Sequence, residues 1–233
     1  MDINKKGMRV VKIINTLFNK LLNTRKTAAV IHPDYKNYEY AQKVTFKSHE
    51  IDVPKWEEGQ MRFIERWFKD YDKGLSIADI SCGDGVGLRQ FRKLGFLNVT
   101  GVDFEEEKII AASKTNYKTY LADFHDLSIF QDNTFDIVYS SHSLEHSYNP
   151  RAVLNEFKRI LKVEGQLILV LPYPDSDDWN IKAHCAKYEL GTNKNDNAKA
   201  VTRYVESFGF KLLKKELDQF REPEVWLCFT KIP

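Results

Sequence analysis

The sequence has few cysteines, little net charge and no long hydrophobic run, and each shortage excludes a class of protein. Its 233 residues include three cysteines, Cys82, Cys185 and Cys228, which lie far apart and form no CxxC pair. Neither a disulfide framework nor a zinc knuckle is therefore expected, and a reducing compartment, the cytoplasm, fits this usage best. The net charge of +2 provides no general attraction to nucleic acid.

The longest apolar run, Leu167–Leu171, is far shorter than the ~18 residues that a membrane-spanning helix requires. A signal peptide is not expected either, because Asn15, Asn19 and Lys20 interrupt the apolar residues near the N-terminus. Hydrophobic residues nevertheless make up 42% of the chain and aromatic residues 13%. This composition predicts a globular protein with a substantial core, organised as one domain with attachments.

Residues 8–22 have the spacing of an amphipathic helix. Between residues 1 and 26 the chain carries seven basic residues and one acidic residue, Asp2. A basic amphipathic helix suits an anionic membrane surface, but the same apolar stripe could cover the protein's own core or a second copy of the chain. Residues 27–55 show no clear period and are expected to form an irregular connector.

From residue 56 the pattern becomes regular, and Trp56–Phe68 predicts a helix. Strands are then predicted at 75–80, 98–103, 117–122, 134–140 and 166–171, and helices at 86–94, 105–114 and 150–162. Strands that alternate with helices indicate parallel pairing, because parallel strands need a long crossover connection. The sequence therefore predicts an α/β fold with a doubly wound, Rossmann-like sheet and helices on both faces.

Turn signals refine this expectation. Asn149 and Pro150 place a favoured N-cap residue before a proline at the first helical position. Residues 173–196 form a polar stretch much longer than a tight connection, and loops of that length are usually functional or disordered. Two final strands, 210–217 and 224–231, are close enough in the chain to form an antiparallel hairpin.

The stretch "IADISCGDGVG" follows the first predicted strand and contains Gly83, Gly85 and Gly87. Glycines at this density indicate that the backbone turns tightly or touches something. The dinucleotide pattern GxGxxG fails in both registers. An acid, Asp79, precedes the loop instead, where a carboxylate can orient the loop or accept from an ammonium group and would repel a pyrophosphate.

These residues resemble motif I of the class I S-adenosylmethionine-dependent methyltransferases, and further family motifs follow in order. "VTGVDFEE" matches the end of the second strand, which implies that Asp103 binds the ribose hydroxyls beside Phe104. "YLADFHDL" matches the end of the third strand, which implies that Asp123 accepts from the adenine amino group and Phe124 packs on the ring.

"FDIVYSSHSLEHSYNP" is similar to the fourth-strand segment of the group that includes ubiquinone-biosynthesis methyltransferases, which places Ser140 and Ser141 near the methionine part of the cofactor. "RILKVEGQLILVLPY" matches the passage into the fifth strand, with Val163 and Glu164 in place of the usual Pro-Gly. The resemblance covers residues 56–172 and implies a seven-stranded, mostly parallel sheet whose last strand is reversed.

The resemblance divides the chain into an N-terminal attachment, 1–55, and a methyltransferase domain, 56–233, with residues 173–196 inserted over the acceptor site. Trp56, Gln60 and Phe63 lie on the helix that could close the cofactor pocket, although ordinary packing explains Trp56 and Phe63 equally well. The residues expected to bind S-adenosylmethionine are Asp79, Ser81, Gly83, Gly85, Asp103, Phe104, Asp123, Phe124, Ser140, Ser141 and Gln60.

Three histidines are candidates for a general base: His146, His142 and then His184. His142 and His146 are four residues apart and would share a helical face, but with no third ligand evident in the sequence no metal site is predicted. Cys82 is expected to be a packing residue, and Asp136 is expected to brace a strand end.

The predicted function is methyl transfer from S-adenosylmethionine to an oxygen or nitrogen of a small acceptor such as a sugar, a lipid or another metabolite. Nucleic acid is not the expected acceptor, because no basic patch interleaved with aromatic residues lies near the site. Two alternatives stay open: an NAD-dependent oxidoreductase, and a non-catalytic S-adenosylmethionine-binding or membrane-associated protein.

Overall fold

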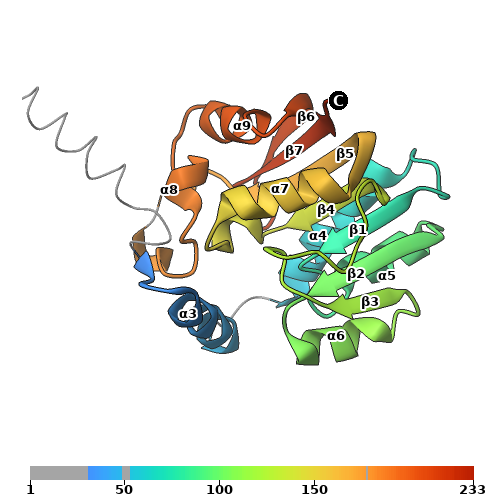
Figure 1. Ribbon diagram of the computed structural model, residues 1–233, viewed down its shortest axis with the longest axis horizontal. Coiled ribbons are helices and arrows are strands. Elements are labelled where there is room, and N and C mark those ends of the chain that lie inside the picture. The colour runs from blue at the N-terminus through green and yellow to red at the C-terminus, as the bar shows by residue number, and fades with distance from the viewer. Residues whose placement is uncertain (1–30, 49–52, 177) are drawn as a thin grey trace, which may run out of the picture.

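The computed structural model describes residues 31–48, 53–176 and 178–233, and this part of the chain contains a seven-stranded sheet (Figure 1). The strands are β1 Ser76–Ile80, β2 Asn98–Asp103, β3 Lys118–Leu121, β4 Phe135–Ser141, β5 Leu161–Pro172, β6 Phe210–Asp218 and β7 Glu224–Lys231. Their order is β3-β2-β1-β4-β5-β7-β6, and β7 runs antiparallel to both of its neighbours. The doubly wound sheet with a reversed last strand is thus confirmed, as is the terminal hairpin.

Strand β1 lies between β2 and β4, at the point where the strand order reverses. Ile80, the last residue of β1, pairs with Val102 of β2 and with Ser140 of β4. Asp103 and Ser141 follow these partners, so the carboxyl ends of three parallel strands meet at one edge. In open α/β sheets the ligand crevice forms at this edge.

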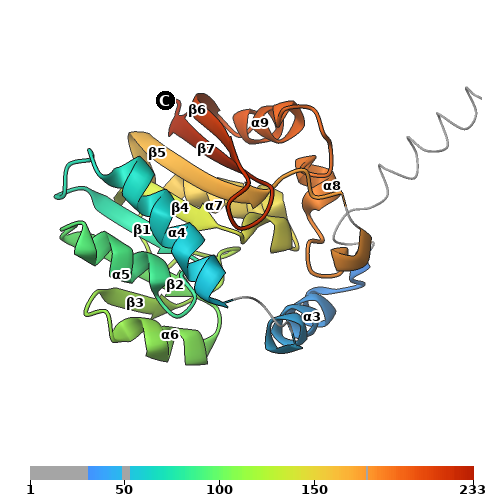
Figure 2. The same cartoon turned by 180° about the vertical axis from the view of Figure 1, so that it is seen from behind.

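Helices cover both faces of the sheet, as Figures 1 and 2 show from opposite sides. One face carries α4 Val53–Phe68, α5 Val86–Lys93 and α6 Glu106–Ser113, and the other carries α7 Pro150–Ile160 and α9 Lys199–Glu206. Each layer of helices encloses its own cluster of buried apolar side chains against the sheet. The two clusters together form the core that holds the strand ends in place.

Helix α7 begins where the sequence predicts. The side chain of Asn149 accepts a hydrogen bond from the backbone N–H of Ala152, at 3.1 Å, and Pro150 is the first helical residue. The helix ends at Ile160, and β5 starts directly at Leu161 rather than at residue 166. The early part of β5 contains an irregularity in its pairing with β4, so the gap between the helix predicted at 150–162 and the strand predicted at 166–171 is a bulge within β5.

Two segments expected to be irregular contain helices. The connector 27–55 includes α3 Tyr35–Ser48, and the insert 173–196 includes the short helices η2 Asp178–Asn180 and α8 Lys187–Leu190. The pattern of α3 is weak because Gln42, a polar residue, occupies a buried position of this helix. Over the described residues, no helix combines the length and the apolar composition that a membrane span requires.

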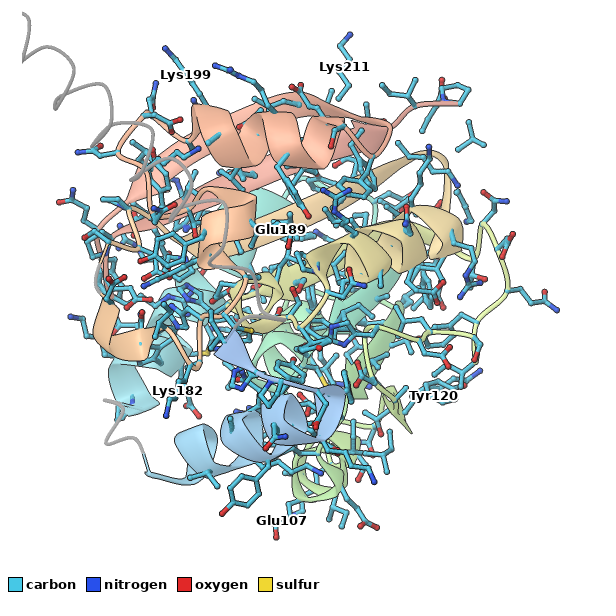
Figure 3. All side chains as sticks on the ribbon, turned by 60° about the vertical axis from the view of Figure 1, so that its left-hand side comes forward. Glu107, Tyr120, Lys182, Glu189, Lys199 and Lys211 are labelled. Carbon is cyan, nitrogen blue, oxygen red and sulfur yellow. The ribbon has the colours of Figure 1, made fainter. Side chains whose placement is uncertain are left out.

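Helix α3 and the insert lie against each other at one end of the molecule. Figure 3 looks onto this end and shows α3 below the segment that carries Lys182. The side chain of Gln42 donates to the backbone carbonyl of Ala183 at 3.0 Å, and a ring nitrogen of His32 lies 2.8 Å from the carbonyl of Lys182. These bonds satisfy backbone groups of the insert that no sheet or long helix pairs.

Candidate active site

The glycine loop turns from β1 into α5 at the carboxyl edge of the sheet. Gly85 has a φ of +88°, and a Cβ added there would lie 3.1 Å from both Ala112 and Thr115 of the neighbouring segment. A Cβ at Gly87 would lie 2.5 Å from a carboxylate oxygen of Asp79. Gly85 and Gly87 are therefore required because neighbouring residues of the protein leave no room for a side chain. Of the three glycines, only Gly83 faces an open space.

A cleft of about 700 Å³, its open mouth included, begins at this loop. Its size is typical of sites for small ligands. Ser81, Gly83, Asp103, Phe104 and Phe124 of the expected cofactor-binding set line it. The other lining residues are Tyr38, Gln42, Glu105, Lys108, His142, Ser143 and His146.

Asp103 holds the loop in place at one end of the cleft. Its two carboxylate oxygens accept from the backbone N–H of Gly83 at 2.9 Å and of Glu105 at 3.0 Å. Burial raises the pKa of Asp103, and the N–H groups of Glu105 and Gly83 oppose that rise. Each oxygen keeps lone pairs that can accept further hydrogen bonds from a ligand.

Asp79 lies behind the loop rather than on the wall of the cleft. Its carboxyl group is 1% exposed, and one oxygen has no hydrogen-bond partner. Burial, together with the nearby charge of Asp103, raises the pKa of Asp79 to about 8. An orphaned buried carboxylate of this kind is stabilised only by a proton or by a cationic ligand group.

The remaining expected cofactor residues lie outside the cleft wall. The carboxylate of Asp123 is engaged by the hydroxyl of Tyr35 and by His125, whose backbone N–H donates at 2.8 Å. Ser140 Oγ bonds to Ser143 Oγ, and Ser141 Oγ accepts from Arg221 at 3.3 Å.

On helix α4, the side chain of Gln60 lies beside Gly87 and Asp79. Trp56 and Phe63 do not line the cleft either. The Trp56 ring packs edge-on against His142, and Phe63 is a fully buried core residue stacked on Tyr139. Ordinary packing thus accounts for Phe63.

His142 follows β4 in a left-handed conformation with a φ of +50° and lines the cleft. Its Nε2 lies 2.9 Å from a carboxylate oxygen of Glu224, and its Nδ1 lies 3.3 Å from Glu222. Burial and the charge of Arg221 lower the pKa of His142 to about 4, against the influence of Glu224. This histidine is therefore neutral at physiological pH and held by acids.

His146 and His184 meet although they come from different segments. His146 lies on the turn η1 Leu144–His146 and lines the cleft, and its Nδ1 lies 3.0 Å from the carbonyl of Ala183. His184 lies on the insert, outside the cleft wall, and its Nδ1 lies 2.7 Å from Asp175. The two imidazole rings are in edge contact, with centroids 4.7 Å apart.

Several residues at this end were not found from the sequence. Tyr38 and Gln42 reach the cleft from α3, which the sequence pattern did not indicate. Glu145 is 0% exposed with no hydrogen bond to either oxygen, and burial raises its pKa well above the usual value. The signal for Glu145 is its place between His142 and His146 in the sequence, but only the fold shows that it faces inward.

Two residues with structural roles behave as expected. Asp136 accepts from the hydroxyl of Ser76 at 2.6 Å and from Lys162 at 2.8 Å, and so ties β4 to both of its neighbouring strands. Cys82 is 4% exposed, and burial raises the pKa of its thiol. A thiol in that state packs and does not act as a nucleophile.

Comparison with known proteins supports a single family. A family model described as a methyltransferase domain matches residues 78–169. An uncharacterized protein of Methanocaldococcus jannaschii is 31% identical over 60% of this chain and 72% of its own length. A ubiquinone biosynthesis O-methyltransferase of Maricaulis maris is 34% identical over 41% of this chain, but the match spans only 40% of that enzyme.

A solved structure extends the likeness to the fold. The cyclase SpnF superposes with a TM-score of 0.60 at 16% identity, over 76% of this chain and 81% of its own. At that identity the likeness shows the fold alone. The relatives give no support to an NAD-dependent oxidoreductase. The motifs occur in the family's order, the strand order is that of the family's sheet, and a methyltransferase domain matches the central residues. The chain therefore belongs to the class I methyltransferases that use S-adenosylmethionine.

Proposed function

We propose that this chain transfers the methyl group of S-adenosylmethionine to an oxygen atom of a small-molecule acceptor. The observation that carries the proposal is one continuous cleft with two unlike ends. The glycine loop and Asp103 form one end, and His146 with aromatic rings forms the other. A transferase needs this arrangement because its donor and acceptor must meet in line.

The cofactor end supplies a carboxylate for two polar parts of S-adenosylmethionine, the ribose hydroxyls and the ammonium group. Asp103 accepts from the ribose hydroxyls with the lone pairs that its two backbone partners leave available. Asp79 stabilises the ammonium group of the methionine part from behind the loop. Phe104 and Phe124 line the cleft beside these acids and offer apolar surface to the adenine ring.

The acceptor end suits a small molecule with an apolar body and a hydroxyl group. Tyr38 provides aromatic surface, and Gln42 offers an amide on the α3 side. Among the lining residues, Lys108 is the one lysine or arginine, and its charge acts on the carboxylate of Asp103. Such a lining does not attract a polyanion. The ubiquinone-biosynthesis relative carries O-methyltransferase in its name, which favours oxygen as the reacting atom.

His146 is the preferred base among the three candidate histidines. Its Nδ1 must donate to the carbonyl of Ala183, so Nε2 is the nitrogen that can accept a proton. In the reaction, the acceptor oxygen forms a bond to the methyl carbon while the bond from that carbon to sulfur breaks. The acceptor proton passes to His146. His142 is held by two acids, and His184 lies outside the cleft wall.

Calorimetry with Asp103→Asn tests the cofactor end. Losing one charged hydrogen-bond acceptor is expected to weaken S-adenosylmethionine binding by roughly 10–100-fold. Asp72→Asn is the matched control, because Asp72 makes the same bond to the N–H two residues ahead, at 2.8 Å from Gly74, far from the cleft. Equal affinity in the wild type and Asp103→Asn contradicts the proposed ribose site.

Incubation with methyl-labelled S-adenosylmethionine tests the acceptor class. Purified protein is mixed with a lysate separated into small molecules, nucleic acid and protein, and label is expected in the small-molecule fraction. Label in either macromolecular fraction contradicts the acceptor proposal but leaves the cofactor site standing. If no fraction takes up label and the protein does not bind S-adenosylmethionine, the whole proposal is contradicted.

Residues 8–22 lie outside the described part of the chain, and their role stays a proposal drawn from the sequence. We infer peripheral contact with an anionic membrane, or with a second copy, through the basic amphipathic pattern. Co-sedimentation with anionic vesicles, compared between the full chain and a variant lacking residues 1–26, tests the first. The mass in solution tests the second.

A further inference from the structure

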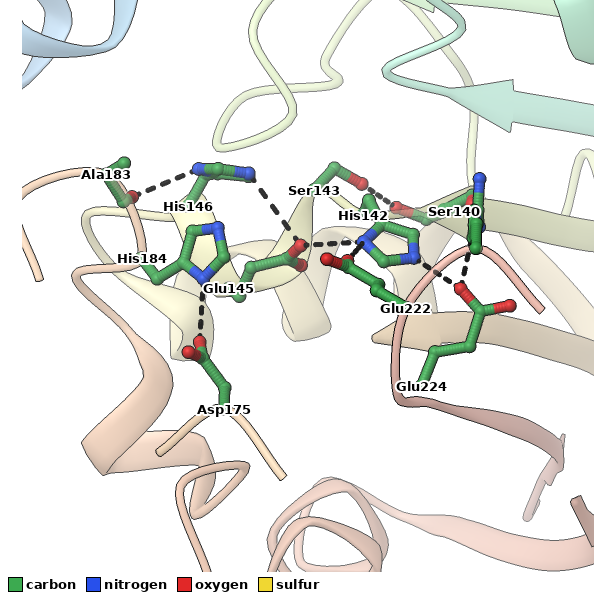
Figure 4. Close-up of polar contacts among 12 residues, drawn as sticks. Ser140, His142, Ser143, Glu145, His146, Asp175, Ala183, His184, Glu222 and Glu224 are labelled. Atoms are coloured by element: carbon green, nitrogen blue, oxygen red, sulfur yellow. Dashed lines mark hydrogen bonds and ion pairs between the residues drawn. The ribbon is translucent and has the colours of Figure 1, made fainter. Parts of the chain in front are cut away.

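Glu145, His146 and His184 form a cluster beside the acceptor end of the cleft (Figure 4). One ligand atom from each residue lies within 4.8 Å of the other two. Glu145 and His146 come from the turn after β4, and His184 comes from the insert. The fold thus assembles, from two distant segments, the third ligand that the sequence spacing alone did not reveal.

Glu145 has a buried carboxyl group without a hydrogen-bond partner. Its side chain is 0% exposed, and neither oxygen has a hydrogen-bond partner. The ring nitrogens nearest to it, in His142 and His146, are each 3.7 Å from Oε1, which is too far for a hydrogen bond. A buried carboxylate in this state requires a proton or a bound positive ion.

Both histidines of the cluster present Nε2 as an electron-pair donor. His146 donates its Nδ1 proton to the carbonyl of Ala183 at 3.0 Å, and His184 donates its Nδ1 proton to Asp175 at 2.7 Å. The amide nitrogen of Asn180 donates to the other oxygen of Asp175 at 3.1 Å and lies 2.9 Å from Nδ1 of His184, but the carboxylate of Asp175 can only accept, so Nδ1 keeps its proton for that bond. Metal-bound histidines typically have their second nitrogen fixed in this way, by a carboxylate or a backbone carbonyl.

Asp175 is suited to orient His184 because other side chains of the insert hold it in place. Lys187 is itself buried, with its Nζ 3.4 Å from Asp175 and 2.7 Å from Asn180. The carboxylate behind His184 is therefore paired with side chains of the insert, unlike the carboxyl group of Glu145.

We propose that Glu145, His146 and His184 bind one divalent transition-metal ion, with Zn²⁺ as the best match. Two imidazole nitrogens and one carboxylate oxygen are a ligand set that zinc uses in catalytic sites, where a fourth position stays open. Ligands around such an ion lie roughly 3.3–3.5 Å apart. The pair formed by Glu145 and His146 is already at 3.7 Å, so a small inward shift of His184 completes the site.

The site adds to the methyl-transfer proposal and stands independently of it. Because His146 lines the cleft, the open position of the ion faces the space assigned to the acceptor. A hydroxyl bound there loses its proton more readily. With the ion bound, the proton of that hydroxyl would pass to solvent water rather than to His146, whose Nε2 would hold the ion.

The test is zinc binding to the full chain, purified without a polyhistidine tag and stripped with a chelator. The wild type is expected to bind one equivalent of Zn²⁺ in competition with a chromophoric chelator, and Co²⁺ is expected to give visible d–d bands. Glu145→Gln and His184→Ala should each weaken Zn²⁺ binding by about 100-fold, since each removes a ligand. His125→Ala is the matched control, because His125 is paired with Asp123 away from the cluster.

Asp175→Asn serves as a second variant because it leaves all three ligands in place. It should weaken Zn²⁺ binding by about 10–100-fold. Circular dichroism identifies any variant that fails to fold. A wild type that binds no zinc, or a His125→Ala variant that loses as much affinity as Glu145→Gln, overturns the proposal. Neither outcome bears on S-adenosylmethionine binding, which is measured separately.

Discussion

Replacing Asp79 by asparagine is expected to stabilise the folded chain and to weaken cofactor binding. The carboxyl group is buried, and burial with the charge of Asp103 raises its pKa to about 8 from an ordinary value of 3.8. Between these two pH values the folded state binds more protons than the unfolded state. The free energy of unfolding therefore falls as pH rises through this window.

The size of the effect follows from the same pKa. Each pH unit within the window costs about 1.4 kcal/mol, so ionisation of Asp79 in the unfolded chain lowers the free energy of unfolding by at most about 4 kcal/mol at pH 7. Water entry and relaxation of the folded chain reduce that bound. We expect Asp79→Asn to gain about 1–3 kcal/mol at pH 8 and almost nothing near pH 4.

The assay is urea unfolding of the wild type and Asp79→Asn at both pH values, without cofactor. The difference between the two proteins isolates Asp79 from other buried acids such as Glu145. Parallel pH profiles, or a less stable Asp79→Asn at pH 8, would refute the reasoning about burial. Calorimetry in two buffers should also show proton release when the wild type binds S-adenosylmethionine below pH 8, and none for Asp79→Asn.

Two further substitutions test the local structure around the site. Gly85→Ala should lower the free energy of unfolding by about 1–3 kcal/mol, because Gly85 has a φ of +88° and its Cβ would lie 3.1 Å from Ala112. Gly74→Ala, where the new Cβ meets nothing closer than 3.4 Å, should be tolerated in the same urea titration. Asn149→Ala should cost about 1 kcal/mol through the lost N-cap of α7 and leave S-adenosylmethionine affinity unchanged in calorimetry.

The cofactor end was predictable because its signals are local. The glycine loop, Asp103 and Phe104 each sit directly at the end of a predicted strand, and parallel strands bring such ends to one edge. Asp123 shows where a prediction from strand ends fails. Its position after β3 is as expected, but its carboxylate is engaged by Tyr35 of α3 and by His125. A single strand end does not reveal what another segment brings to it.

The acceptor end could not be predicted because it depends on contacts between distant segments. The hydrophobic pattern of α3 is interrupted by Gln42. This polar side chain can be buried because its amide donates a hydrogen bond to the insert. A scan for hydrophobic periodicity discards such a position. Likewise His184 could be named as a candidate from the sequence, but its place beside His146 required the insert to fold back over η1.

One backbone carbonyl connects these distant segments to the chemistry of the site. The oxygen of Ala183 accepts from Nδ1 of His146 and from Nε2 of Gln42, both at 3.0 Å, and a carbonyl oxygen has lone pairs for two donors. The bond to His146 sets which ring nitrogen faces Glu145 and the cleft. The bond to Gln42 fixes the carbonyl itself, from a helix that lies well before the methyltransferase motifs. The orientation of the His146 imidazole is therefore determined by residues outside those motifs. The motifs alone predict the cofactor end of the cleft but not its acceptor end.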